Sequence, residues 1–321
     1  MIGLLVGAGF SKWAAGLPLA KELFDFRIEP FGVRETGWLE RARHLKSLWD
    51  QEHSGDPAEA FIAYALERDA TTRRLVLWYV VRRLSDPYIW KEWHAWKWRR
   101  HVLMIDENRK VTRPGVAQVR GFLIGVMGPQ LAGVVTTNYD LLVEYALGTG
   151  GFNYGSPGER LQGRGPYPVS QWRNPVTLTG RMPLAKVHGS ISWDARGRYT
   201  DGRRGLTGDA LIVAPTPHKL PPGSLQGQWE LAGDILRRSS RLLVFGFAFN
   251  RYDSAFLELL QTEGRRLKDV VLVDIAPNEK AARRIWNGAT VKSLRPPPEG
   301  GEELRRWVKG DTVNVAGGTS I

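Results

Sequence analysis

The sequence of 321 residues contains no cysteine. Disulfide bonds, thiolate catalysis and zinc sites with cysteine ligands are therefore excluded. No apolar run approaches the roughly 18 residues that a membrane-spanning helix needs. The opening segment MIGLLVGAGF also lacks the basic stretch and the cleavage site of a signal peptide. We therefore expect a cytoplasmic protein that does not span a membrane.

Basic residues outnumber acidic ones, with 45 Lys and Arg against 33 Asp and Glu, which gives a formal net charge of +12. Such a charge favours acidic partners, including nucleic acids and anionic cofactors, without specifying one. The basic residues are spread along the chain and are not gathered in one tail or helix. Direct nucleic-acid binding is therefore an alternative and not the leading hypothesis.

Short apolar runs alternate with helical patterns along most of the chain. Strands are predicted at 2–6, 131–137, 184–187, 210–214, 242–245 and 270–275. Helices are predicted at 19–26, 141–147, 229–239, 252–264 and 279–286. This alternation predicts an α/β fold with a Rossmann-like, doubly wound, mostly parallel sheet that carries helices on both faces.

Two long segments interrupt the alternation. Residues 33–128 have a helical pattern and are predicted to form a helical insert, whereas residues 148–182 are rich in Gly, Pro and Asn and predict an irregular loop over the site. Within the insert, residues 90–101 (WKEWHAWKWRRH) interleave tryptophan with basic residues. That pattern favours a packing or partner-binding helix, and base stacking is the alternative.

A glycine turn follows the first predicted strand at Gly7-Ala8-Gly9. Glycines there let the backbone approach a pyrophosphate, and the following helix N-terminus offers N–H groups to the anion. An ordinary tight turn is the alternative explanation. Lys12 stands where G-x-G-x-x-G has its third glycine, and no acidic residue ends a second strand about 20 residues later, so the pattern does not favour a dehydrogenase.

Polar residues follow two further strands. Asn138 and Asp140 can cap the next helix, or they can reach ribose hydroxyls and an attacking water. His188, before a glycine, can accept a proton at neutral pH or polarise a ribose hydroxyl, although a lone histidine can equally be structural. The other five histidines lack metal-ligand spacing, so no metal is expected.

The same motifs occur in a recognisable order along residues 2 to about 275. They are Gly7-Ala8-Gly9-Phe10-Ser11, Gly16-Leu17-Pro18, Thr136-Thr137-Asn138-Tyr139-Asp140, residues 186–193 (KVHGSISW), Pro215-Thr216, and Phe245-Gly246-Phe247 with Asp253. In this order and context the sequence resembles the sirtuin-related SIR2-like family of bacterial antiphage-defence NAD hydrolases.

The resemblance implies that residues 1–321 form a single SIR2-like domain, with NAD bound as the substrate at the strand ends. It implies Asn138 and His188 as the catalytic residues. Asn138 would orient the water or the ribose, and His188 would act as general base, directly or through a ribose hydroxyl. Asp140 would order the Asn138 turn or bind ribose. The implied NAD-binding set is Gly7, Ala8, Gly9, Phe10, Ser11, Pro18, Thr137, Asn138, Asp140, His188, Gly246, Phe247 and Asp274.

Two departures from sirtuin deacetylases bear on the activity. Those enzymes carry a four-cysteine zinc module, which a chain without cysteine cannot form. A serine often follows the glycine that corresponds to Gly246, whereas this chain continues with Phe247-Ala248-Phe249-Asn250. The first departure counts against protein deacetylation, and the second leaves open which residue contacts the phosphates there.

The function predicted from the resemblance is hydrolysis of NAD to nicotinamide and ADP-ribose, which would deplete NAD during infection. A partner or self-assembly would activate the enzyme. The resemblance suggests a homo-oligomer, or a partner encoded nearby such as an ATPase or an Argonaute-like protein. The alternatives are an NAD-dependent protein deacylase or ADP-ribosyltransferase, a non-catalytic sensor of NAD or ADP-ribose, and a basic nucleic-acid adaptor.

Overall fold

The computed structural model describes residues 1–30, 32–85, 114–147, 151–155, 182–194, 210–214 and 223–311. Three sequence features lie wholly or mostly outside the described residues. They are the tryptophan-rich segment 90–101, most of the predicted loop 148–182, and Pro215-Thr216.

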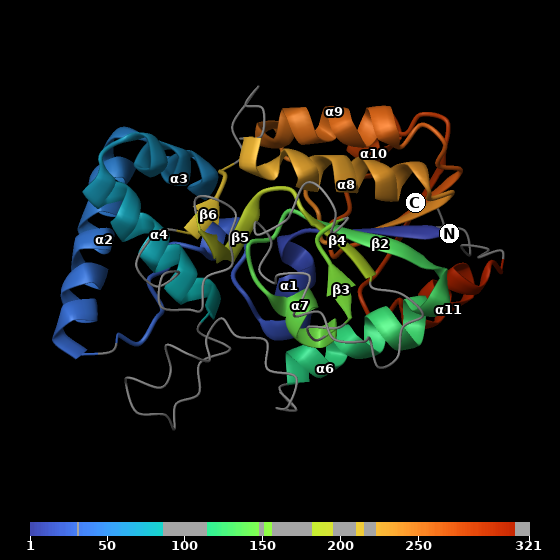
Figure 1. Ribbon diagram of the computed structural model, residues 1–321, viewed down its shortest axis with the longest axis horizontal. Helices are drawn as coiled ribbons and strands as arrows, with labels where there is room; N and C mark the ends of the chain where they lie inside the picture. The colour runs from blue at the N-terminus through green and yellow to red at the C-terminus, as the bar shows by residue number, and fades with distance from the viewer. Residues whose placement is uncertain are drawn as a thin grey trace, which may run out of the picture.

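A seven-stranded parallel sheet forms the centre of the molecule (Figure 1). Its strand order is β3-β4-β2-β1-β7-β8-β9, and every neighbouring pair is parallel. The strands are β1 (Ile2–Val6), β2 (Leu131–Thr136), β3 (Phe152–Asn153), β4 (Met182–Lys186), β7 (Arg241–Phe245), β8 (Asp269–Val273) and β9 (Thr290–Leu294). The predicted α/β fold with a doubly wound parallel sheet is confirmed.

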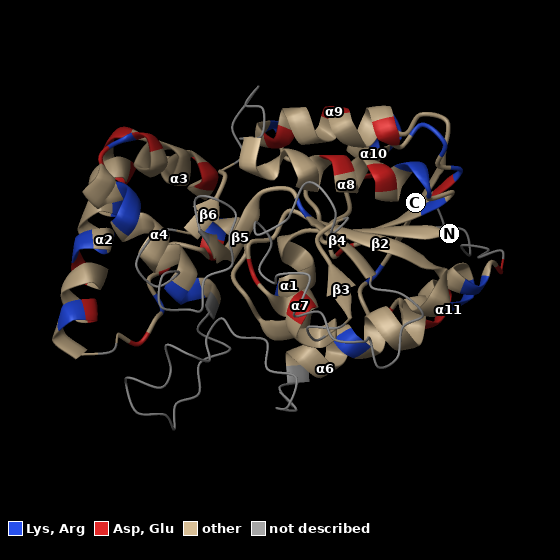
Figure 2. Ribbon diagram, viewed as in Figure 1, with Lys and Arg blue, Asp and Glu red and all other residues tan. Residues whose placement is uncertain are grey.

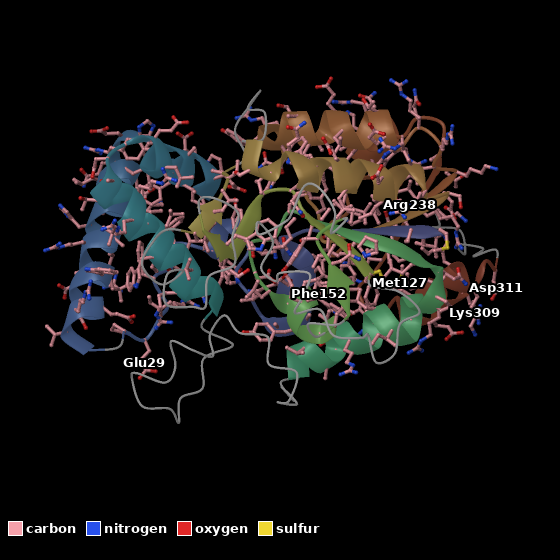
Figure 3. The ribbon with its side chains drawn as sticks, viewed as in Figure 1. Glu29, Met127, Phe152, Arg238, Lys309 and Asp311 are labelled. Carbon is pink, nitrogen blue, oxygen red and sulfur yellow. The ribbon has the colours of Figure 1, made fainter. Side chains whose placement is uncertain are left out.

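Helices cover both faces of this sheet (Figure 1). One face carries α1 (Ala8–Ala15), α6 (Pro114–Arg120), α7 (Leu142–Leu147) and α11 (Gly301–Lys309); the other carries α8 (Gln226–Arg237), α9 (Ser254–Glu263) and α10 (Glu279–Ile285). Because successive side chains of a strand point to opposite faces, Leu4 and Val6 pack in the first layer and Leu5 packs in the second. Met127 and Phe152, labelled in Figure 3, belong to the first layer.

A helical unit stands beside the sheet and contains α2 (Gly32–Glu52), α3 (Ala58–Glu67) and α4 (Ala70–Ser85) (Figure 1). It packs on a two-stranded antiparallel ribbon of β5 (Gly189–Asp194) and β6 (Ala210–Ile212). The later part of the expected insert behaves differently, since α6 and the π-helical turn Gly121–Met127 pack in the core of the sheet.

Basic and acidic residues are distributed over many helices (Figure 2). They are not concentrated on a single element of the described part of the chain. No helix in the described ranges is both long enough and apolar enough to cross a bilayer.

The predicted helix at 19–26 is wrong. A helix starts directly at Ala8 and ends at Gly16, whose φ of 67° places it in the left-handed conformation favoured by glycine. Only a 3₁₀ turn, Ala20–Glu22, follows. Glu22 accepts a hydrogen bond from the Leu19 backbone N–H at 3.0 Å, and Phe26 has a positive φ of 56°, so the segment stays irregular.

Candidate functional site

The carboxyl ends of the central strands meet at one edge of the sheet. From β1 the chain continues to β2 on one side, whereas β7 leads to β8 on the other. The connections that follow the neighbouring strands β1 and β7 therefore run to opposite sides, and in doubly wound sheets a ligand-binding crevice forms at such a point. The predicted site residues lie in the segments that follow these strand ends.

Three glycines bring the loops after β1 and β7 into direct backbone contact. Gly9 N donates to Gly246 O at 3.0 Å, and Gly7 N donates to Phe245 O at 3.0 Å. Gly246 has a φ of 65°, and a Cβ atom there would lie 2.3 Å from Phe10 N. These glycines are therefore required by the contact between the loops, which places the N-terminus of α1 in the crevice.

Two adjoining cavities occupy the crevice. The inner one, of about 120 Å³, is lined by Asn138, His188 and Asp140, and the outer one, of about 750 Å³, extends past Gly246 to Asp274. The outer volume lies within the range of roughly 300–1,000 Å³ typical of ligand pockets. The lining includes the predicted residues Ala8, Gly9, Ser11, Pro18, Thr137, Asn138, Asp140, His188, Gly246, Phe247 and Asp274.

Gly7 and Phe10, also predicted to bind NAD, do not line either cavity. The Phe10 ring is buried, with its centroid 5.1 Å from that of Phe245. Gly7 lies beneath the site, where its carbonyl accepts a hydrogen bond from Asn138. Both residues thus support the site from below.

Hydrogen bonds fix the Asn138 side chain. Its Nδ2 donates to Gly7 O and to Ser11 Oγ, each at 2.9 Å, and Ser11 Oγ donates in turn to Asp140 Oδ2 at 2.8 Å. The other Asp140 oxygen accepts from Leu142 N at 2.9 Å and caps α7. Because both amide hydrogens are used, the carbonyl oxygen of Asn138 is the atom that remains to accept a hydrogen bond from a ligand.

A buried ion pair lies behind this turn. Lys186 Nζ is 2.9 Å from Glu144 Oε1, and both side chains are 1% exposed. Lys186 Nζ also donates to the Asp140 carbonyl, and Tyr154 donates to Glu144 at 2.8 Å. This network holds the backbone between Asn138 and α7.

His188 follows β4 and is buried against a carboxylate. Its Nε2 lies 3.1 Å from Asp253 Oδ1, without the alignment of a hydrogen bond, and Asp253 Oδ1 has no hydrogen-bond partner among the described residues. The neighbouring backbone is fixed, because Val213 N donates to His188 O at 2.9 Å and Trp229 Nε1 donates to Val187 O at 2.8 Å.

Glu59 is a site residue that the sequence reasoning missed. It lies in the first turn of α3 and lines both cavities. Burial raises the pKa of its carboxyl, and the nearby Asp253 raises it further. Burial also raises the pKa of Tyr139, with smaller contributions from Glu59 and Asp253. No motif marks Glu59, since acidic residues are common in the first turn of any helix.

Within the described ranges, no cluster of three or more histidine or acidic side chains is placed to bind a metal ion.

Comparison with solved structures finds distant similarity to Sir2 enzymes. A structure from work on the mechanism and regulation of Sir2 enzymes is 15% identical, with 96% of this chain and 91% of that chain covered and a TM-score of 0.45. A Sir2 homologue mutant with 2′-O-acetyl-ADP-ribose is 16% identical, covering 98% and 94%, with a TM-score of 0.42. A Sir2 complex with an inhibitor, 2′-O-acetyl-ADP-ribose and a deacetylated p53 peptide is 16% identical, covering 97% and 93%, with a TM-score of 0.41. No family model and no curated protein matches the chain.

Proposed function

We propose that this protein binds NAD along the crevice and hydrolyses its nicotinamide–ribosyl bond, releasing nicotinamide and ADP-ribose. One observation carries the proposal: Asn138 and His188 line the inner end of a continuous crevice, the N-terminus of α1 lines its middle, and Asp274 lines its outer end. This order fits nicotinamide ribose, pyrophosphate and adenosine.

The outer cavity offers suitable groups for the rest of the dinucleotide. The first turn of α1 contains no acidic residue, so its positive end favours the pyrophosphate, and Lys12 and Lys21 line the same cavity. Asp274 can accept a hydrogen bond from an adenosine ribose hydroxyl. Ile275 is 71% exposed and offers apolar surface to the adenine ring.

In the proposed reaction, the bond between ribose C1′ and nicotinamide breaks, and its electron pair leaves with nicotinamide. The ribosyl centre gains oxocarbenium character, as in glycoside cleavage, and water adds to C1′. The carbonyl oxygen of Asn138 orients the water or a ribose hydroxyl. His188 accepts the proton, directly or through a ribose hydroxyl, and then releases it to solvent.

The resemblance of the motifs to the antiphage-defence family also suggests a biological role for this activity. The enzyme would deplete NAD during infection once a partner protein or self-assembly activates it. The α3 helix of the helical unit contributes to the lining of both cavities. A partner bound to the helical unit could therefore act on the crevice.

The test is to incubate the purified protein with NAD, alone and with candidate partners, nucleic acid or an acyl-lysine peptide, and to quantify nicotinamide and ADP-ribose. We expect Asn138→Ala and His188→Ala each to lower the rate at least about 100-fold. The matched controls are Asn287→Ala and His44→Ala, at exposed positions away from the crevice.

Two outcomes would contradict the hydrolase proposal. Release of nicotinamide only with the acyl-lysine peptide would indicate a deacylase. NAD binding without release under any condition would indicate a sensor.

A further inference from the structure

Glu59 stands where the two cavities of the crevice join. It lines both of them, as do Ala8, Thr137 and Asp253. Glu59 differs from the predicted site residues because it comes from the helical unit and not from a loop that follows a strand of the central sheet. On the proposed binding mode, this junction is where the nicotinamide ribose meets the pyrophosphate.

Glu59 lines the cavities without an ion pair to a Lys or Arg of the described residues. Its strongest electrostatic neighbours are Asp253 and His188. Asp253 adds a second carboxylate to the same lining; its side chain is only 8% exposed, and within the described ranges its Oδ1 accepts no hydrogen bond. The crevice therefore brings two carboxylates, Glu59 and Asp253, together beside a single histidine, His188.

This arrangement is costly for the fold. Burial and the neighbouring Asp253 both disfavour the charged form of Glu59, so its pKa is raised, although the hydrogen bond from its own backbone N–H and the nearby His188 oppose them. An exposed acidic residue would stabilise the N-terminus of α3 without this cost. Perturbed acidic groups in a cleft are typical of groups that act on a ligand.

We propose that Glu59 is a further catalytic residue, whose carboxylate faces the nicotinamide ribose and stabilises the positive charge that forms there as nicotinamide leaves. The inference rests on the proposed function and deepens it. In the ground state the same carboxylate is attracted by the cationic nicotinamide ring. As the C1′–N bond breaks, the ring becomes neutral and the positive charge moves to the ribosyl centre. Water then adds, and its proton leaves through His188.

Turnover of NAD by the full-length protein gives the first test. Glu59→Gln keeps the size of the side chain and removes its charge, so we expect kcat to fall about 100-fold while KM rises by no more than about tenfold. The matched control is Glu67→Gln, which alters an exposed glutamate at the end of the same helix and should leave kcat unchanged. A Glu59→Gln variant with the kcat of the unaltered protein would overturn the proposal.

A binding measurement tests the same carboxylate without turnover. In the His188→Ala background, calorimetry would compare NAD with NADH, whose nicotinamide ring is uncharged. Adding Glu59→Gln should reduce the preference for NAD over NADH about tenfold, because the ring loses an anionic neighbour. An unchanged preference would overturn the role of Glu59. If the preference depends on Glu59 but the unaltered protein never releases nicotinamide, the result would support the placement of Glu59 beside the nicotinamide ring and contradict hydrolysis.

Discussion

At the scale of single residues, Gly246 has little freedom to change. Gly246→Ala would introduce a side chain at a positive φ of 65° and push its Cβ to within 2.5 Å of Gly9 Cα. We expect a loss of roughly 2–3 kcal/mol in the free energy of unfolding, measured with urea, together with weaker NAD binding. Gly288→Ala is the control, because a Cβ atom there meets nothing within 4 Å. Equal stability of the two variants would contradict the contact between the loops.

Asp274 is the residue we expect to discriminate NAD from NADP. Its Oδ1 accepts a hydrogen bond from Ala276 N at 3.0 Å, so the carboxylate is held at the outer end of the crevice. A 2′-phosphate beside it would be repelled. Asp274→Asn keeps the acceptor oxygen and should raise kcat/KM for NADP about tenfold relative to NAD, since one repulsive charge is removed. An unchanged ratio would place the adenosine ribose elsewhere.

The sequence predicts the residues that follow strands better than those supplied by other elements. Asn138, His188 and Gly246 converge because parallel strands end at one edge of the sheet, a consequence of fold class alone. Glu59 comes from α3, and local sequence pattern does not predict where this helix packs relative to the sheet. Phe10 shows the opposite limitation: its motif indicates a binding loop, but the helical turn points its ring into the core.

At the scale of elements, Tyr79 ties α4 to the irregular segment that lines the crevice. Its hydroxyl donates to Leu23 O at 3.0 Å and accepts from Phe26 N at 2.9 Å. Tyr79→Phe leaves both backbone groups without this partner, so we expect a loss of about 1–3 kcal/mol in stability and a higher KM for NAD. The control is Tyr64→Phe on α3, whose hydroxyl forms no hydrogen bond within the described residues. A Tyr79→Phe variant with unaltered stability and KM would show that these two hydrogen bonds contribute neither to stability nor to NAD binding.

Several element predictions depended on information that local pattern does not contain. The sequence predicts a glycine turn at Gly7-Ala8-Gly9, but Gly7 serves as an extended N-cap and α1 already starts at Ala8. The predicted strand at 210–214 forms β6, which pairs antiparallel with β5 and not with the central sheet. β9 and α11 were not predicted. β9 is a largely half-buried strand at the edge of the sheet, and α11 buries only Leu304, Trp307 and Val308 of its nine residues.

At the scale of the whole molecule, the buried Lys186–Glu144 pair links the candidate site to the stability of the whole protein. Lys186→Met leaves a buried Glu144 without its cation, so we expect the free energy of unfolding to fall by about 3–5 kcal/mol. The double variant Lys186→Met/Glu144→Leu should lose less than the sum of the two single variants, because it leaves no unpaired charge. Simple additivity in urea unfolding would contradict coupling between these two residues.

Glu59 should make stability depend on pH. Its pKa is raised in the folded protein above the ordinary value of 4.5, so the folded state holds this proton more tightly than the unfolded state. The contribution of Glu59 is therefore fully present below pH 4.5 and is lost as pH rises through the folded pKa. Glu59→Gln does not titrate, so its Tm should exceed that of the unaltered protein at pH 7, with the difference shrinking toward pH 4.5. A constant difference would contradict the raised pKa.

The most direct test of the account is a crystal structure of the His188→Ala variant with NAD bound. The account predicts the nicotinamide ribose between Asn138 and Glu59, the pyrophosphate at the N-terminus of α1, and the adenosine ribose beside Asp274. NAD bound in the reverse orientation, or outside the crevice, would contradict it.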